Sequence, residues 1–508
     1  MDCRIRTASG AVRGRLVCAV GAAAAVVLLA SLGTPAAAET TAETAAETAA
    51  ALPTLDWEEC GDGVECSVAR LPLDHSKPEE ETIGVALARV PAARQGAKIG
   101  TLFVDPGVQA GGGAAFVRAL GPAGLEPLSE RFDIVGIDAR GTGGGGPLTT
   151  CMTYEEIRSI EPPLAAYPTT AQRSDRMEEA QKLTAACDER SEELLPHLGS
   201  QDSALDLELL RAAVGDEKLN YLGLSYGSLV GQYYAATFPE RVRAMVLDSP
   251  VPAHRDARVP LRSDREQMAA TEKALDEFFD WCVATPEMCG FGDGDPEGAF
   301  DGLVERLERN REAAPGDHTL FTGGDLLVQT AGTLIAPASW EQFAARLQRL
   351  EEVERPTKQL PSGWDHTTAA VLGNRCLDRA VPSLPRVHDA HFRAAAAVSP
   401  HFGRVYGYGQ LKCAVWPAEP AHPHTDGYRY RGGQPMLVIG RTTDPLVPFS
   451  WTREVAVTNR ASLLTVEGPG HIAFRSGSEC VDSAVADYVI HLREPERGAT
   501  CSTPPPSA

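Results

Sequence analysis

The residues most suited to chemistry in this chain surround a serine in the motif Gly223-Leu224-Ser225-Tyr226-Gly227. An apolar segment, Asn220 to Leu222, precedes the motif, and a helix-like run, Ser228 to Thr237, follows it. This order of strand, tight turn and helix is typical of a nucleophile elbow, whose glycines let the chain turn sharply. The turn would place the serine hydroxyl at a helix N-terminus, where the backbone N–H of Tyr226 stabilises a developing oxyanion. Ser225 is therefore predicted to be the nucleophile of an acyl-transfer reaction.

A serine nucleophile needs a histidine base that is oriented by a carboxylate, and after such an elbow the chain order is Ser, then Asp or Glu, then His. Asp444 follows the apolar run Met436 to Gly440, and His471 follows the next run, Ser462 to Val466. Both residues would then lie in loops at strand ends. A turn aspartate before proline and a surface histidine are the alternatives. Two suitable residue types in the required order favour a triad with Ser225.

A second oxyanion donor is expected from the loop that follows the predicted strand Thr101 to Asp105. Glycines at 107 and 111–113 would let backbone N–H groups approach the site without a Cβ in the way. We predict Val108 as this donor, with an ordinary surface loop as the alternative. The mechanism needs no cofactor. No metal site is expected, because the chain has no CxxC pair and its histidines do not cluster with its cysteines.

The elements that must position these residues alternate between short β-branched runs and longer helical patterns, as in a parallel sheet covered by helices. The predicted strands are Ile83 to Val90, Thr101 to Asp105, Asp133 to Asp138, Asn220 to Leu224, Ala244 to Asp248, Met436 to Gly440 and Ser462 to Val466. Together with the elbow, this pattern predicts an α/β protein with the α/β-hydrolase fold and a mostly parallel central sheet.

A long insert separates the strand that ends near Asp248 from the strand that begins near Met436. Its pattern is mostly helical, for example from Glu266 to Cys282 and from Ala299 to Glu312. Ligands of open α/β sheets bind outside the carboxyl ends of the strands, so the insert is predicted to be a helical cap over the site. A separate domain is the alternative. The expected divisions are a first core part at 53–250, a cap at 251–432 and a second core part at 433–508.

The first residues have the order of a secretory signal peptide. Arginines come early, an apolar run extends from Leu16 to Leu32, and small residues follow at Ala36 to Ala38. We expect residues 1–38 to be cleaved off and the product to be secreted and extracellular; a retained anchor would need a longer apolar run. Residues 39–52 repeat Ala, Glu and Thr, which predicts a low-complexity linker or propeptide.

Composition limits the partners of the chain. Its net charge of -22 disfavours nucleic acid and anionic lipid, so neither is expected to bind once the signal peptide is removed. Two of the 12 cysteines lie in the signal peptide, and the even remainder indicates structural disulfides. Connectivity cannot be deduced from spacing, so pairing between neighbours is a hypothesis. The hypothetical pairs are Cys60–Cys66, Cys151–Cys187, Cys282–Cys289, Cys376–Cys413 and Cys480–Cys501.

Taken together, these residues resemble the secreted tripeptidyl aminopeptidases of actinobacteria, in the proline-iminopeptidase-like branch of the α/β-hydrolases. The resemblance runs from about Trp57 to Cys501. The matching pieces are Asp138-Ala-Arg-Gly-Thr-Gly, Tyr221-Leu-Gly-Leu-Ser-Tyr-Gly, Phe238-Pro-Glu-Arg-Val, Val246-Leu-Asp248 and the stretch from Pro435 to Cys480. The resemblance implies the Ser225, Asp444 and His471 triad, a helical cap, and release of short peptides from a free amino terminus.

Two stretches depart from the pattern of this family. The family usually has Asn-Pro-Gly-Gly-Pro-Gly-Gly-Ser-Gly in the oxyanion loop. Here that loop carries substitutions at Asp105, Val108, Gln109, Ala110 and Gly112. A second family motif usually contains a serine where this chain has Gly145.

The expected function is that of a secreted serine exopeptidase that uses the triad and an acyl-enzyme. It is expected to release short peptides, in particular tripeptides, from the free amino terminus of peptide substrates. An aminopeptidase also needs a carboxylate for the substrate ammonium group, and Asp378 and Glu419 are candidates. A secreted carboxylesterase or lipase with the same triad is the first alternative, because ester and amide hydrolysis share this machinery. A non-catalytic binding protein is the second. The sequence leaves the oligomeric state open.

Overall fold

The computed structural model describes residues 51–107, 111–143, 145–161, 163–358, 366–424 and 427–503. The predicted signal peptide, most of the predicted linker and Val108 lie outside these residues. The described part forms a ten-stranded sheet with the order β1-β2-β3-β5-β4-β6-β7-β8-β9-β10. Neighbours from β1 to β5 in this order are antiparallel, and all later neighbours are parallel. The strands are β1 (Glu58–Gly61), β2 (Val64–Pro72), β3 (Thr82–Val90), β4 (Gly100–Asp105), β5 (Phe132–Ile137), β6 (Leu219–Leu224), β7 (Val242–Asp248), β8 (Leu437–Thr443), β9 (Ser462–Pro469) and β10 (Thr500–Ser502).

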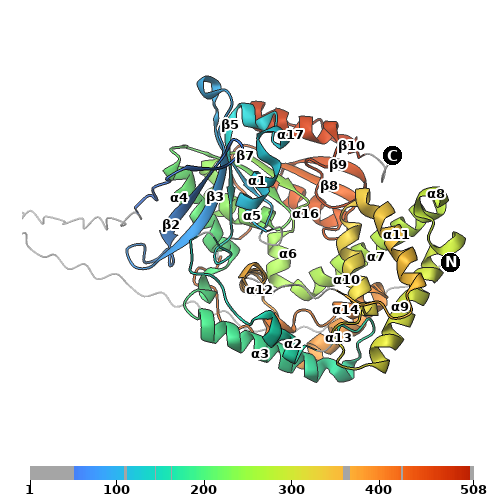
Figure 1. Cartoon of the computed structure of the whole chain (residues 1–508). Coiled ribbons are helices and arrows are strands. Elements are labelled where there is room, and N and C mark those ends of the chain that lie inside the picture. The colour runs from blue at the N-terminus through green and yellow to red at the C-terminus, as the bar shows by residue number, and fades with distance from the viewer. Residues whose placement is uncertain are drawn as a thin grey trace, which may run out of the picture. The chain divides into compact units, whose positions relative to one another are not determined.

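Helices cover both faces of the sheet (Figure 1). Successive strand residues point to opposite faces, so Phe103 and Val104 of β4 belong to two different cores. Val104 packs with α1 (Gly113–Gly124) and α17 (Glu479–His491). Phe103 packs in the core formed with the helices of the other face, which are α4 (Ser200–Ala213), α5 (Gly227–Thr237) and α16 (Phe449–Asn459). Both faces of the central strands are thereby buried, as in a parallel sheet of an α/β protein.

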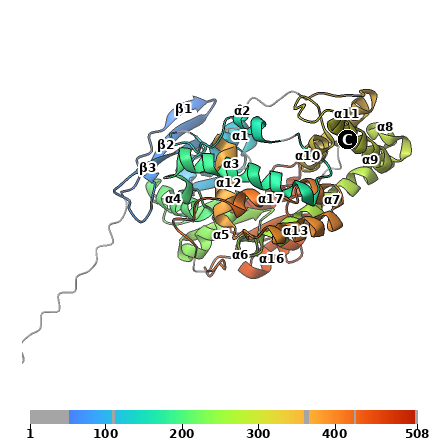
Figure 2. The same ribbon diagram turned by 90° about the horizontal axis from the view of Figure 1, so that it is seen from below.

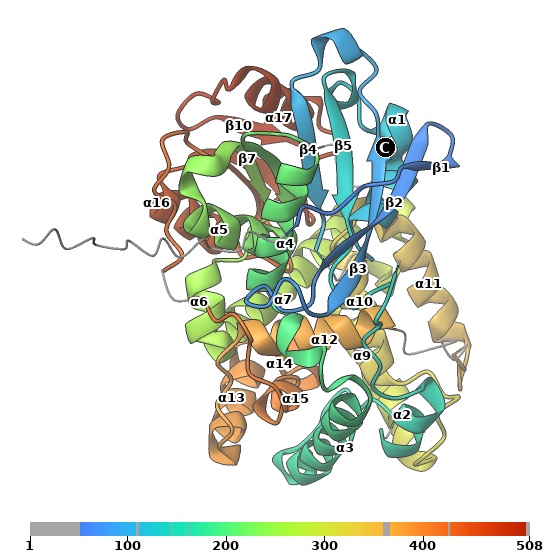
Figure 3. The ribbon, with the colours of Figure 1, turned by 90° about the vertical axis from the view of Figure 1, so that its left-hand side faces the viewer.

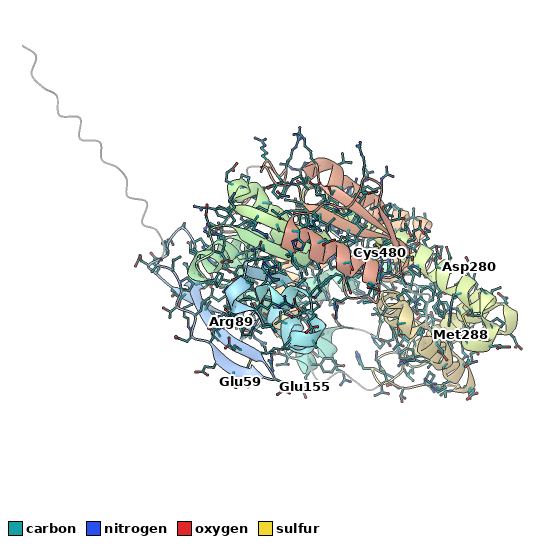
Figure 4. The ribbon with its side chains drawn as sticks, turned by 90° about the horizontal axis from the view of Figure 1, so that it is seen from above. Glu59, Arg89, Glu155, Asp280, Met288 and Cys480 are labelled. Atoms are coloured by element: carbon teal, nitrogen blue, oxygen red, sulfur yellow. A yellow bond between two sulfur atoms is a disulfide. The ribbon has the colours of Figure 1, made fainter. Side chains whose placement is uncertain are left out.

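The chain between β7 and β8 is helical and has a core of its own, built around aromatic residues that include Phe278 and Trp340. Asp280 and Met288 of this segment lie on the opposite side of the view from Glu59 and Arg89 at the sheet edge (Figure 4). The helices are α6 (Ala253–Arg258), α7 (Pro260–Ala284), α8 (Pro286–Cys289), α9 (Pro296–Ala313), α10 (Gly323–Leu334), α11 (Trp340–Glu352), α12 (His366–Asp378), α13 (Pro385–Val398), α14 (Phe402–Val405) and α15 (Leu411–Ala414).

Two helices that precede β6 in the chain also pack against this helical segment. They are α2 (Tyr154–Ile160) and α3 (Arg173–Ser191), and α3 lies alongside the helices of the insert (Figures 2 and 3). Ala180 of α3 is buried with Phe392 and Tyr408. We refer to the helical segment at 249–436 as the cap. It packs against residues from a second part of the chain, which the sequence pattern did not indicate.

Five disulfides join the cysteine pairs that were hypothesised from their order along the chain. The bond between Cys376 and Cys413 links α12 to α15 within the cap. The bond between Cys480 and Cys501 links α17 to β10, and Cys480 is labelled in Figure 4. Within the described residues, every helix is too short or too polar to cross a bilayer.

All seven predicted strands are present, and three further strands were not predicted. The β1–β2 hairpin extends the antiparallel edge, where Arg89 of β3 pairs with Glu65 of β2 and lies 4.2 Å from the Trp57 ring centroid. This edge is partly exposed, so its strands carry polar residues that hide the apolar pattern. β10 has only 3 residues and pairs with β9 at the other edge.

Candidate active site

The nucleophile elbow forms at the carboxyl end of β6, where Ser225 has a backbone φ of 51°. This left-handed conformation is costly for a serine and persists because the surroundings enforce it. A Cβ on Gly223 would lie 2.9 Å from the Gly227 carbonyl oxygen, and one on Gly227 would lie 2.1 Å from the carbonyl oxygen of Asp105. Both positions therefore require glycine, as the motif predicts, and the serine side chain is presented at the start of α5.

The structure brings the three predicted triad residues together. The Ser225 hydroxyl donates to Nε2 of His471 across 2.8 Å, and Nδ1 of His471 donates to Oδ2 of Asp444 across 2.9 Å. Asp444 is only 2% exposed. Its Oδ1 also accepts the backbone N–H groups of Leu446 and Val447, each at 2.9 Å. These bonds fix the carboxylate, which in turn fixes the tautomer and orientation of the imidazole.

The electrostatic surroundings favour a proton on the imidazole. Burial lowers the pKa of His471, but the nearby Asp444 carboxylate outweighs burial and raises the pKa above its ordinary value. An imidazolium that is stabilised in this way is what a base needs at the moment it accepts the serine proton. The arrangement can therefore activate Ser225 for attack on a carbonyl carbon.

A buried carboxylate that sequence reasoning did not assign supports the loop after His471. Asp248, at the end of β7, is fully buried and accepts the backbone N–H groups of Ala473 and Phe474 at 2.9 and 2.7 Å. The backbone N–H of His471 itself donates to the carbonyl of Ile335 in the cap, across 2.9 Å. The loop that carries the His471 imidazole is thus fixed by hydrogen bonds to the sheet and to the cap. Only the position of Asp248 at a strand end could have indicated such a role.

Tyr226 lies where an oxyanion donor is needed. Its backbone N–H directly follows the nucleophile and has no acceptor among the described residues. Its phenol donates to Oδ2 of Asp378 across 2.9 Å, and the same carboxylate accepts the backbone N–H of Ser200 at 2.9 Å. Asp378 belongs to α12, so this contact joins the cap to the nucleophile elbow. Val108, the second predicted donor, lies outside the described residues.

Asp105, one of the substitutions in the first departure from the family pattern, has a structural role. Oδ1 of Asp105 accepts the backbone N–H of Gly107 across 2.7 Å, and its Oδ2 accepts the Tyr221 hydroxyl across 3.1 Å. The side chain therefore shapes the start of the oxyanion loop. Burial raises the pKa of Asp105 to about 6, although both hydrogen bonds oppose this change.

The second departure is also explained by packing. A Cβ on Gly145 would lie 2.5 Å from Cγ1 of Val68 and 3.1 Å from Cα of Gly84. A serine at this position would collide with β2 and β3. The loop can approach the sheet this closely only because residue 145 is glycine.

The two candidates for binding a substrate ammonium group differ in their surroundings. The Asp378 carboxylate is already occupied by Ser200 and Tyr226, and burial raises its pKa to about 6. Glu419 is exposed and lines a surface cavity at the junction of cap and core. Asp378 is thus placed to position Tyr226, a role that its sequence neighbourhood did not indicate.

A mostly parallel sheet, a nucleophile elbow after β6 and a following Asp and His define a serine hydrolase of the α/β-hydrolase fold. Residues 399–501 match the family model described as TAP-like protein. Serine protease Hip1 of Mycobacterium tuberculosis is 30% identical over 466 residues, which cover 86% of this chain and 87% of that protein. The chain belongs to the tripeptidyl-aminopeptidase-like family of α/β-hydrolases.

Other relatives are named for different activities. Tripeptidyl aminopeptidase of Streptomyces lividans is 26% identical over 475 residues, covering 89% of this chain and 87% of that protein. Carboxylesterase B of Mycobacterium tuberculosis is 27% identical over 481 residues, covering 89% and 90%. Among solved structures, a hydrolase from Pseudomonas aeruginosa PA01 covers 84% of this chain and 98% of its own, with a TM-score of 0.34 and 15% identity.

Proposed function

We propose that this protein is a secreted serine exopeptidase that releases short peptides, and tripeptides in particular, from the free amino terminus of its substrates. The observation that carries this proposal is the continuous chain of hydrogen bonds from Asp444 through His471 to Ser225. Relatives that are named as a serine protease and a tripeptidyl aminopeptidase support peptides as the substrate class.

In the proposed mechanism, His471 accepts the hydroxyl proton as the Ser225 oxygen attacks the carbonyl carbon of the scissile peptide bond. The backbone N–H of Tyr226, together with an N–H from the loop at Val108, stabilises the oxyanion. The His471 imidazolium then gives its proton to the leaving amine, and an acyl-enzyme remains. A water molecule, deprotonated by His471, attacks the ester carbonyl and releases the new carboxyl terminus of the product.

The contacts of the cap favour action on chain ends. Ile335 accepts the backbone N–H of His471, and Asp378 accepts the phenol of Tyr226, so cap residues contact both the histidine loop and the nucleophile elbow. We infer that a cap in contact with both segments restricts access for a polypeptide that continues in both directions. A substrate terminus would enter more readily than an internal segment of a folded protein.

Secretion is part of the proposal and rests on two observations. The five disulfides are typical of proteins that fold in an oxidising compartment. The order of the first 38 residues is that of a signal peptide. Amino-terminal sequencing of the protein from culture medium should find a chain that starts after Ala38. Recovery from the cytosol alone, with residues 1–38 still attached, would contradict secretion.

Ester hydrolysis is the second candidate function, because one relative is named carboxylesterase B. The two functions are separated by a panel of p-nitroanilides of one, two and three residues, each with a free or an acetylated amino terminus, beside a short-chain acyl ester. Turnover confined to free-amine peptides supports the exopeptidase, whereas turnover of the ester alone supports the esterase. Ser225→Ala should abolish either activity while leaving the circular dichroism spectrum unchanged; full activity of this variant would contradict the proposed nucleophile.

A further inference from the structure

Three side chains outside the proposed triad meet where the core and the cap join. They are His197, in the short turn before α4, Asp202 on α4, and His422 in the segment between α15 and β8. One nitrogen or oxygen atom from each of these residues lies within 4.8 Å of the others. His197 and Asp202 are neighbours in the chain, but His422 follows Asp202 by 220 residues, so no motif spacing predicted the meeting of all three.

Two of these groups are buried without a hydrogen-bond partner among the described residues. Asp202 is 1% exposed, and its Oδ2 has no donor. Nδ1 of His197 also has no partner, because its separation of 3.7 Å from Oδ1 of Asp202 is too long for a hydrogen bond. Leaving a buried carboxylate oxygen and a buried ring nitrogen unpaired costs free energy, which indicates that an ion or water binds at this cluster.

The third residue is already oriented as metal-binding histidines usually are. Nε2 of His422 lies 3.2 Å from Oδ1 of Asp74, while its Nδ1 lies 2.8 Å from Oδ1 of Asp202. A histidine ligand commonly donates its second ring N–H to a carboxylate, which fixes the tautomer and the orientation of the ring. The Asp74 carboxylate favours the proton on Nε2 electrostatically, which would leave Nδ1 of His422 as the ligand atom.

The charge balance of the cluster also leaves room for a cation. The nearby Arg140 is bound by both oxygens of Asp206 at 2.6 Å and by the carbonyls of Pro72 and Leu73, so Asp206 compensates its charge. Arg140 also lies 3.7 Å from Oδ1 of Asp202, and Lys77 lies 3.7 Å from Oδ2 of Asp74. With neutral imidazoles, the three carboxylates Asp74, Asp202 and Asp206 therefore exceed these two cations by one negative charge, which a bound cation would offset.

We propose that His197, Asp202 and His422 form a binding site for a divalent transition-metal ion of the Zn²⁺ type. Two imidazole nitrogens and one carboxylate are donors that suit Zn²⁺, whereas Ca²⁺ and Mg²⁺ prefer sites made of oxygen alone. A cavity of about 680 Å³, lined by Asp202 and His422 among others, provides a route for the ion. Ligand bonds of about 2.0–2.1 Å would require these side chains to move together by roughly 1 Å.

The bound ion would fasten the cap to the core. Asp202 is two residues from Ser200, whose backbone and side chain bind Asp378 of α12. The segment that contains His422 leads from α15 of the cap back to β8. The ion is thus placed to stabilise the junction of cap and core, and it has no role in proton transfer at Ser225.

The test begins with the mature protein, stripped of metal with EDTA and titrated with Zn²⁺ in a calorimeter. We expect one ion per chain and a higher melting temperature with Zn²⁺ than with EDTA. His422→Ala should weaken binding about 10- to 100-fold. His424→Ala is the matched control, because His424 lines the same cavity but binds Gln201 and Gly427 instead, so this variant should bind as the wild type does.

The wild-type titration decides the proposal even if a variant fails to fold. Absence of saturable Zn²⁺ binding by folded wild-type protein would overturn it, as would equal losses in the His422 and His424 variants. Equal affinity for Ca²⁺ would also overturn it, since that result indicates carboxylates without histidine ligands. Ser225→Ala should bind Zn²⁺ with unchanged affinity, which separates this inference from the proposed peptidase activity.

Discussion

The imidazole of His471 acts as a base only in its neutral form, so its protonation sets the lower pH limit of activity. The Asp444 carboxylate raises the pKa of His471 above the ordinary 6.5, against the effect of burial. kcat/KM should therefore rise with pH through a midpoint above 6.5, in a pH profile measured with a tripeptide anilide. A midpoint well below this value would contradict the assignment of His471 as the base.

Replacement of the Asp444 carboxylate also tests the contact between Asp444 and His471. Asp444→Asn removes the acceptor that holds the tautomer of His471, so kcat should fall by about 10⁴-fold in steady-state assays. The protein should stay folded, because an amide oxygen still accepts the N–H groups of Leu446 and Val447. A loss smaller than about tenfold would show that another residue orients the base.

Asp105 offers a prediction about stability. Its pKa is raised to about 6 by burial, so the folded state binds its proton more tightly than the unfolded state does. The wild type should then lose stability as pH rises from the ordinary carboxyl range through 6. Asp105→Asn should gain about 1–2 kcal/mol in urea unfolding at alkaline pH and nothing at acidic pH. A pH-independent effect would contradict this explanation.

The sequence reveals some residues of the site and hides others for a physical reason. Ser225, Asp444 and His471 each follow a strand that its apolar pattern makes visible, and the order of the three is fixed by the fold. Asp248 and Asp378 act through contacts with distant segments, at Ala473 and Tyr226. The residues next to them in the sequence do not indicate these partners. Such roles depend on tertiary packing alone.

At the scale of helices, His401 ties three parts of the cap together. Its ring lies between Glu272 of α7 and Asp301 of α9, and the side chain is 13% exposed. Burial disfavours the imidazolium, but the two carboxylates outweigh it and raise the pKa of His401 to about 9. A raised pKa means that the protonated ring stabilises the folded state, fully below pH 6.5, and that this contribution is lost as pH rises through about 9.

His401→Gln should therefore lower the free energy of unfolding at neutral pH by an amount on the order of 3 kcal/mol at most. The difference from the wild type should shrink as pH rises towards 10, because the wild-type ring then also becomes neutral. Urea unfolding at several pH values measures this difference. If it stays constant across the range, the two carboxylates do not hold a charged ring.

The burial of each strand and helix determines whether a sequence pattern can predict it. The five central strands, β4 to β8, are buried on both faces and consist of nearly continuous apolar runs, so the sequence pattern predicted them. The β1–β2 hairpin lies at a sheet edge and mixes charged with apolar residues, which masks its period. The association of α3 with the cap follows from packing at Ala180 and cannot be seen in the helix itself.

For the whole molecule, each disulfide should stabilise the folded state by an amount that increases with the number of residues in the loop that it closes. The Cys376–Cys413 bond spans 37 residues, whereas the Cys60–Cys66 bond spans 6. Loop-closure entropy predicts losses of about 4 and about 2 kcal/mol when each pair is replaced by alanine. Denaturant unfolding of the two double variants measures both losses of stability. A larger loss for the variant without Cys60 and Cys66 than for the variant without Cys376 and Cys413 would contradict this prediction.

The general architecture could be predicted because α/β order, chain length and the elbow restrict the fold to one class. The disulfide pairs followed from neighbour order, since each pair joins segments that are close in the chain as well as in space. The junction between core and cap could not be predicted. It is formed by residues such as Asp202 and His422, which lie far apart in sequence and meet only after the whole chain has folded.

The measurement that tests the central claim most directly is mass spectrometry of a long unstructured peptide, with a free amino terminus, during digestion by the mature enzyme. The proposed exopeptidase should shorten the peptide in successive steps of three residues from its amino terminus, and it should leave the acetylated form of the same peptide intact. Cleavage at internal bonds, or equal digestion of the acetylated peptide, would contradict the account.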